Sequence, residues 1–133
     1  LKVYINGEQK TFIQDYVYTN RFDYIKDLNR MGAKIDLLKA SDIGKDFISH
    51  DDSLDLKSTD EPNSVIKIKG PIRLKGEKID ITDIKYGTVL LLAAISAEGK
   101  SFISGINMVN FINEDIIEKF KNLGAKIRYV SID

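Results

Sequence analysis

The sequence predicts an α/β fold in which helices and strands alternate along the chain and pack in layers. Segments with the period of an amphipathic helix alternate with short β-branched segments in which apolar and polar residues alternate. One helix–glycine–strand segment also occurs twice, and both copies contain Gly-Ala-Lys-Ile, at residues 32–35 and 124–127. The two glycines lie 92 positions apart (124 − 32 = 92). A repeat of this length is typical of a domain built from repeated supersecondary units.

In the first half, residues 11–18 are aromatic and β-branched and predict a strand. Asn20 is the expected N-cap of the helix that follows, with Asp23 as a short form of the capping box. The apolar face of this helix consists of four residues at helical spacing: Tyr24, Ile25, Leu28 and Met31. We expect Gly32 to end the helix in the left-handed conformation, and residues 33–38 to form the next strand.

Residues 39–63 differ from their surroundings, because they are rich in serine and aspartate and close on Glu-Pro-Asn. They predict a polar, partly mobile insertion within one partial domain that covers residues 1–133. The single histidine of the chain, His50, lies in this insertion. One histidine without a second is more typical of a solvated loop residue than of a metal ligand.

In the second half, residues 65–69 and the alternating residues from 72 to 81 predict strands. Thr82 or Asp83 then caps a helix over residues 84–97, which is apolar on nearly every face and should be buried on most sides. We expect a strand at 101–106, the second repeat helix at 114–123 and a final strand at 125–130.

The composition excludes several classes of partner and of catalytic site. The 133 residues are 43% hydrophobic and 30% charged, which suits a single globular domain. Twenty basic and twenty acidic residues leave no net charge that would recruit nucleic acid or an anionic membrane. The absence of cysteine excludes disulfides, thiolate metal sites and a cysteine nucleophile. Glycine-rich phosphate loops are absent, and the sequence shows no Ser-His-Asp motif around the single histidine.

The longest apolar run, at residues 89–95, is far below the roughly 20 residues that span a bilayer. The N-terminus has neither the basic region nor the apolar core of a signal peptide. These features predict a cytoplasmic location. The chain begins with Leu1 and enters regular sequence almost at once, so we expect a fragment of a longer protein.

Two cations occupy unusual positions. Arg21 directly follows the expected cap of the first helix, and Lys85 lies in the expected first turn of the central helix. A helix start carries partial positive charge and disfavours a further cation, unless both meet an external anion such as phosphate or carboxylate. The alternative is a surface ion pair, of Arg21 with Asp23 or Asp27 and of Lys85 with Asp83.

Several motifs, in order along the chain, resemble the UDP-N-acetylglucosamine enolpyruvyl transferase family. Residues 18–22 and 27–33 (Tyr-Thr-Asn-Arg-Phe and Asp-Leu-Asn-Arg-Met-Gly-Ala) are similar to the family's "ENRF…EL-RMGA". Residues 82–87 (Thr-Asp-Ile-Lys-Tyr-Gly), with Ala-Glu-Gly at 97–99, are similar to "TDLRAG…AEG". Residues 68–76 and 120–127 resemble a family hairpin and the closing "LGA-I". The sister shikimate-pathway enzymes begin the central helix with Asp-His-Arg, which this chain lacks.

The resemblance implies a bacterial, cytoplasmic enzyme of two similar domains, each an inside-out α/β barrel of three βαβαββ units. About one and a half units are present here. The implied reaction transfers enolpyruvyl from phosphoenolpyruvate to UDP-N-acetylglucosamine in peptidoglycan synthesis, without a metal or organic cofactor. The implied partners are these two substrates and the missing remainder of the chain, with no nucleic acid or membrane.

By position, the resemblance places Val17 against the UDP-sugar and makes Arg21 and Lys85 catalytic and substrate-binding residues. Lys85 stands where the family has an arginine, which keeps the charge but loses the bidentate fork. Phe111 replaces a second phosphate-binding arginine of the family's "HIDRGYE" motif. The family's catalytic cysteine, lysine and aspartate map outside the chain. We therefore expect the fragment alone to be inactive. The alternative is a non-catalytic paralogue that binds a nucleotide sugar or a protein.

Overall fold

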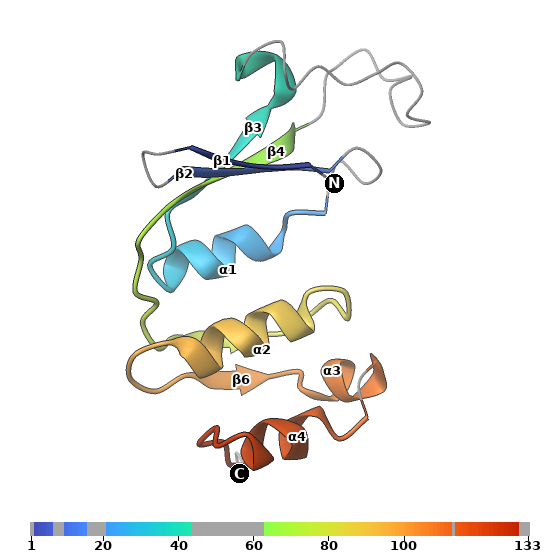
Figure 1. Cartoon of the computed structure of the whole chain (residues 1–133). Helices are drawn as coiled ribbons and strands as arrows, with labels where there is room; N and C mark the ends of the chain where they lie inside the picture. Colours follow the sequence, from blue (N-terminus) through green and yellow to red (C-terminus); the bar gives the residue numbers. More distant parts are fainter. Residues whose placement is uncertain (1, 7–9, 16–20, 44–62, 113, 131–133) are drawn as a thin grey trace. The chain divides into compact units, whose positions relative to one another are not determined.

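The computed structural model describes residues 2–6, 10–15, 21–43, 63–112 and 114–130. They belong to two compact units, Leu1–Arg73 and Leu74–Asp133, and Figure 1 labels most of their helices and strands. The prediction of one partial domain over residues 1–133 concerns how these units combine, and it stays a prediction. Of the predicted insertion at 39–63, the start forms a short 3₁₀-helix, η1 (Ala40–Asp42). Residues 44–62, with His50, lie outside the described part of the chain.

The first unit contains a four-stranded antiparallel sheet of order β1-β2-β4-β3, with helix α1 (Tyr24–Arg30) on one side of it (Figure 1). The strands are β1 (Lys2–Asn6), β2 (Lys10–Gln14), β3 (Ile35–Lys39) and β4 (Asn63–Lys69). Strand β4 pairs with β2 and β3 and is antiparallel to both, so β2 and β3 run parallel to each other. The predicted strands at 33–38 and 65–69 are confirmed. The β1–β2 hairpin was not predicted.

The core of the first unit contains the apolar residues that the helical and strand patterns select. Ile25 and Met31 are buried as predicted for the apolar side of α1. On the sheet, Val65 and Ala40 are almost fully buried and pack with Phe12, Leu38 and Ile43. Burial of such side chains stabilises a fold by roughly 1.5–3 kcal/mol each.

Helix α1 ends as the sequence predicts. Gly32 has φ +97°, and its N–H donates to the carbonyl of Asn29 at 3.0 Å. The N–H of Ala33 donates to the carbonyl of Leu28 at 2.9 Å. These two bonds form a Schellman motif, which satisfies the last carbonyls of the helix.

The side chain of Asn29 ties this helix end to the next strand. Its Nδ2 donates to the carbonyl of Ile35 at 2.9 Å, and the N–H of Ile35 donates to its Oδ1 at 3.0 Å. One amide therefore serves both polar backbone groups of Ile35, at the point where β3 begins.

The second unit contains a β–α–β segment followed by two short helices. Strands β5 (Lys78–Asp80) and β6 (Phe102–Ser104) are parallel, with α2 (Gly87–Ser96) between them in the chain. Helices α3 (Asn107–Ile112) and α4 (Ile116–Asn122) follow. The core includes Ile79, Ile81, Leu91 and Val109, each at most 2% exposed. Gly87 lies against this core, since an added Cβ would meet Val109 Cγ2 at 2.6 Å.

Two expectations for this unit are wrong, and one of its helices was not predicted. Helix α2 begins at Gly87 rather than near residue 84, and residues 84–86 form a turn. Helix α3 was not predicted. It has only six residues and comes directly after a predicted strand, so the sequence shows no helical period there. Residues 125–130 do not form the expected strand; among the described residues no strand pairs with them, and Ile127 donates to Ala125 at 3.1 Å.

The burial expected for α2 holds on part of its surface. Gly87, Leu90, Leu91 and Ala93 are buried, whereas Val89 and Leu92 are 40% and 47% exposed. The helix and the glycine of the repeat are confirmed, because α4 ends like α1, whereas the strand of the second copy is not formed. Gly124 has φ +96°, and the bonds from Gly124 to Lys121 and from Ala125 to Phe120 measure 2.9 Å.

Candidate functional site

Lys85 lies in a tight turn that Asp83 organises before α2. The N–H of Lys85 donates to Asp83 Oδ1 at 2.9 Å, and the N–H of Tyr86 donates to the Asp83 carbonyl at 3.2 Å. The Lys85 ammonium lies 3.6 Å from Asp83 Oδ2. The prediction that Thr82 or Asp83 caps the helix is wrong, because the N-cap of α2 is Tyr86; the Asp83 side chain closes a turn instead, and Lys85 precedes the helix. The surface ion pair that we considered as an alternative is present.

Both partners of this pair are accessible. The Lys85 side chain is 54% exposed and that of Asp83 is 35% exposed. An exposed pair of this kind contributes about 1 kcal/mol or less, because water and salt screen it. The ammonium can therefore exchange the carboxylate for another anion at little cost.

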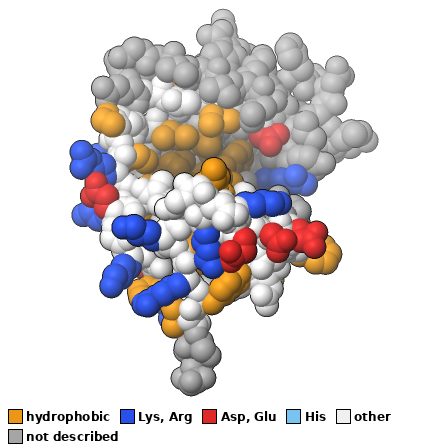
Figure 2. Space-filling model, turned by 60° about the horizontal axis from the view of Figure 1, so that its bottom comes forward, with side chains coloured by type: hydrophobic (Ala, Val, Ile, Leu, Met, Phe, Trp, Pro, Cys, Tyr) orange, Lys and Arg blue, Asp and Glu red, His pale blue; other side chains and the backbone are white. Residues whose placement is uncertain are grey.

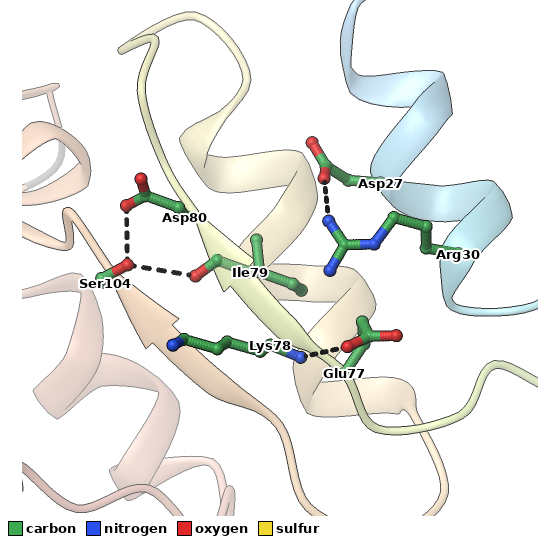
Figure 3. Close-up of polar contacts among 7 residues, drawn as sticks. All are labelled: Asp27, Arg30, Glu77, Lys78, Ile79, Asp80 and Ser104. Carbon is green, nitrogen blue, oxygen red and sulfur yellow. Dashed lines mark hydrogen bonds and ion pairs between the residues drawn. The ribbon is translucent and has the colours of Figure 1, made fainter.

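Arg21 is exposed and belongs to the first unit. It does not lie in the first turn of α1 as predicted, because that helix begins at Tyr24 with Asp23 as N-cap. The N–H of Ile25 donates to the carbonyl of Phe22 at 3.0 Å, so the turn that leads into the helix begins after the arginine. Asp27, one of its two candidate partners, pairs with Arg30 at 3.1 Å (Figure 3).

Two predicted positions complete the set. Val17, expected against a nucleotide sugar, lies outside the described residues, as does the expected cap Asn20. Phe111 lies in α3 and is 85% exposed. Arg21 and Lys85 belong to different units, so each position is described only within its own unit.

A polar pair that the sequence reasoning missed lies at the carboxyl ends of β5 and β6. The Ser104 hydroxyl donates to Asp80 Oδ1 at 2.6 Å and lies 3.4 Å from the carbonyl oxygen of Ile79 (Figure 3). The register brings them together, since Ile79 pairs with Ile103 and Asp80 with Ser104. The sequence carried no signal for this pair, because it depends on the parallel register of β5 and β6, which the sequence analysis did not predict.

The chain passes close to itself directly after this pair. Gly105 has φ +75°, and a Cβ there would overlap the carbonyl oxygen of Ile81. The N–H of Ile81 donates to the carbonyl of Ser104 at 3.0 Å. The backbone after β5, which leads to Asp83 and Lys85, is therefore fixed against the end of β6. Ligands of open parallel sheets commonly bind outside the carboxyl ends of the strands.

The chemistry of this edge is electrostatic. Ser104 donates to a carboxylate and has no histidine among the described residues to remove its proton, so it does not form an activated nucleophile. The described residues also contain no group of three potential metal ligands. Figure 2 shows cationic and anionic side chains lying among hydrophobic ones on the face drawn. The turn after β5 offers the ammonium group of Lys85 beside the carboxylate of Asp83.

Within the described residues, no helix has the length and apolar character that crossing a bilayer requires. This finding agrees with the short apolar runs of the sequence.

Comparison with known proteins gives a consistent result. No family model matches the chain. UDP-N-acetylglucosamine 1-carboxyvinyltransferase 2 of Listeria monocytogenes serotype 4b is 31% identical over 121 residues, which are 91% of this chain and 23% of that protein. The UDP-N-acetylglucosamine 1-carboxyvinyltransferase of Pelagibacter ubique is 29% identical over 125 residues, or 94% of this chain and 24% of the relative.

Among solved structures, the enolpyruvyl transferase NikO of Streptomyces tendae matches with a TM-score of 0.66 and 23% identity. The match covers 95% of this chain and 24% of that one. The predicted α/β class is confirmed, as a fragment of the enolpyruvyl transferase fold. The resemblance in the sequence motifs is confirmed by the relatives, and the chain spans about a quarter of their length.

Proposed function

We propose that this chain, a homologue of the UDP-N-acetylglucosamine 1-carboxyvinyltransferases over about 91% of its length, is the C-terminal part of an enolpyruvyl transferase-like protein. The longer protein transfers the enolpyruvyl group of phosphoenolpyruvate to UDP-N-acetylglucosamine, a step in peptidoglycan precursor synthesis in the bacterial cytoplasm. It uses no metal or organic cofactor. The 133 residues alone are inactive. The similarity to these transferases over 121 residues carries the proposal.

In this reaction, both substrates bring phosphate or carboxylate groups, and catalysis depends on placing cations against them. The exposed Lys85 ammonium, 3.6 Å from Asp83, is free to turn from its carboxylate partner to such a group. Arg21 supplies a second cation from the first unit, and Val17 contacts the UDP-sugar. A preorganised donor that meets charge in the transition state is worth about 10²–10³-fold in rate.

Inactivity of the fragment follows from the chemistry that is missing. The described residues hold no activated nucleophile, and the chain has no cysteine. The addition of an enolpyruvyl group also needs a residue that handles protons at the reacting carbon. The remainder of the longer protein, with its second domain, supplies these groups and encloses the substrates.

The complete protein encoded by the reading frame is the material for the test. Phosphate release from phosphoenolpyruvate is measured with and without UDP-N-acetylglucosamine. Lys85→Ala should lower kcat/KM by about 10²-fold or more. Lys100→Ala is the matched control, because it removes another exposed lysine of the same unit. No release in the wild type, or equal rates for the two variants, would contradict the catalytic proposal.

A second candidate function has an observation of its own in its favour. Phe111 stands where the family motif has a phosphate-binding arginine, and its ring is 85% exposed. A phenyl ring cannot neutralise a phosphate, which suits a paralogue that binds a nucleotide sugar without turnover. Calorimetry with UDP-N-acetylglucosamine, on a protein that releases no phosphate, identifies this function. Phe111→Arg should then raise affinity for phosphoenolpyruvate; an unchanged affinity would count against the aligned role of this position.

A further inference from the structure

Residues 82–86 form a short connection whose two ends lie against each other. Ile81, the residue before the connection, is 2% exposed, and Gly87, the residue after it, is buried. A Cβ on Gly87 would lie 3.2 Å from Cγ2 of Ile81, so the start of α2 packs directly on Ile81. Lys85 lies within this connection. Its position in the unit therefore depends on what holds Ile81.

Ser104, the last residue of β6, contacts the residues that lead to this connection. Its hydroxyl donates to Asp80 Oδ1 at 2.6 Å and lies 3.4 Å from the carbonyl oxygen of Ile79, as Figure 3 shows. Its carbonyl accepts from the N–H of Ile81 at 3.0 Å. A bond from a hydroxyl to a carboxylate is charge-assisted and stronger than one between neutral groups. The end of β5 is thus held by a side chain as well as by the backbone.

The bonds inside the connection do not tie it to the strands. Asp83 accepts from the N–H of Lys85 at 2.9 Å and lies 3.6 Å from its ammonium, which places the lysine relative to the connection itself. The two side chains are 54% and 35% exposed, so their packing does little to hold the connection against β5 and β6. A short segment with such local bonds moves as one body when its base loosens.

A second serine joins the same two strands at their other end. Ser101 lies directly before β6, and its hydroxyl accepts from the N–H of Glu77 at 3.4 Å. Glu77 lies directly before β5, so this bond is at the opposite end of the strands from Asp80 and Ser104. Of these two serines, Ser104 is the one at the end that leads to Lys85.

We propose that Ser104 is a positioning residue for Lys85. Its hydroxyl fixes Asp80 at the end of β5, and its carbonyl fixes Ile81. Ile81 and Gly87 then hold the two ends of the connection that carries the Lys85 ammonium. Ser104 touches no substrate in this role. It keeps the ammonium where an anionic group of a substrate meets it, and a misplacement of about 1 Å can lower a rate by about 100-fold.

This role rests on the proposed function, because Lys85 is the cation which that function places against the substrates. Phosphate release by the complete protein measures it. Ser104→Ala should lower kcat about 10-fold, since the connection shifts by less than its full freedom allows. Ser104→Thr keeps the hydroxyl and should restore most of the rate. Ser101→Ala, the matched control, should leave the rate unchanged. Equal rates for Ser104→Ala and Ser101→Ala would overturn the proposal.

A double-mutant cycle separates positioning from a general loss of structure. In a protein that already carries Lys85→Ala, Ser104→Ala should lower the rate no further, because the group that Ser104 positions is gone. A residue that merely stabilised the fold would cause the same loss in both backgrounds. An equal loss in both would therefore overturn the proposal.

Hydrogen exchange of single amides, read by NMR of the complete protein, gives a measurement that needs no activity. The Ile81 amide donates to Ser104, and the Phe102 amide donates to Glu77 at the other end of the strands. In Ser104→Ala the Ile81 amide should exchange at least about 10-fold faster while Phe102 is unchanged. In Ser101→Ala the Ile81 amide should keep its wild-type rate. Unchanged exchange of Ile81 in Ser104→Ala would contradict the anchoring.

The two measurements together distinguish this inference from the proposed function. Faster exchange at Ile81, in a protein whose wild type releases no phosphate, keeps the anchoring of the connection and refutes the transferase. Phosphate release that Ser104→Ala leaves unchanged refutes the positioning role and keeps the transferase.

Discussion

The two copies of the repeat share a helix end and differ in the strand that follows it. Gly32 and Gly124 have φ values of +97° and +96°, and both are followed by the same pair of Schellman bonds. After Gly32 the chain enters β3 beside β4, and after Gly124 it enters residues without a described strand partner. The helix end is therefore determined locally, because its bonds lie within six residues. The strand is determined by a partner that is distant in sequence.

The largest difference between the copies is expected at the residue before each glycine. Met31→Ala should lower the free energy of unfolding by about 2–5 kcal/mol, because it leaves a cavity at a fully buried side chain. Leu123→Ala should change it by less than about 0.5 kcal/mol, since that side chain is 82% exposed. Urea unfolding of the 133-residue chain, followed by circular dichroism, measures both. Equal losses would mean that Leu123 is buried in solution.

The next effect concerns the amide that ties α1 to β3. Asn29→Ala removes two hydrogen bonds to Ile35 and should cost about 1–3 kcal/mol in the same experiment. Lys121 is the corresponding residue of the second copy. Lys121→Asn should leave stability within about 0.5 kcal/mol, because Ile127 has no strand to join. A clear gain from Lys121→Asn would show that the amide alone can organise the second strand.

The two glycines should respond alike. Alanine at φ near +97° costs about 1 kcal/mol, and neither position is crowded enough to add a clash. A Cβ on Gly32 would lie 3.6 Å from the Arg73 carbonyl, and one on Gly124 would have no neighbour within 4 Å. Gly32→Ala and Gly124→Ala should therefore lower the free energy of unfolding equally. A loss confined to Gly32→Ala would contradict the local origin of the helix end.

The smallest effect is expected from the ion pairs along the two helices. Arg30 lies 3.1 Å from Asp27, and Lys121 lies 2.7 Å from Glu118, both at a spacing of three residues. Arg30→Ala and Lys121→Ala should each change stability by less than about 0.5 kcal/mol. Thermal unfolding at low and high salt measures this contribution. A loss above 1 kcal/mol that salt does not reduce would show that packing, rather than charge, holds either side chain.

Local features of the fold were predictable from the sequence, and features that depend on partners were not. The glycine stops and the apolar side of α1 follow from spacing and from glycine's freedom at positive φ. The start of α2 was misplaced because the Asp83 side chain makes the same bond in a turn as in a helix cap. The strand at 125–130 was predicted from its pattern, but a strand also needs a neighbour.

In the candidate site too, contacts between near neighbours in the sequence were predictable and contacts between distant residues were not. The ion pair of Lys85 and Asp83 was predictable, because the residues are two positions apart. The bond between Ser104 and Asp80 was missed, because it joins residues 24 positions apart and depends on the register of β5 and β6. Register is a property of the pairing and not of either strand alone.

The Asn29 amide affects how readily the sheet of the first unit can pair with strands of other molecules. Strand β3 is an edge of its sheet, and Ile35 presents a donor and an acceptor on the outer side. Asn29 bonds to both, so Ile35 has no backbone donor or acceptor left for a strand of another molecule. Exposed sheet edges promote aggregation unless they are shielded. The first copy thus shields the start of this edge with a side chain of its own helix, and we expect aggregates of the isolated chain to begin at β6 and residues 125–130.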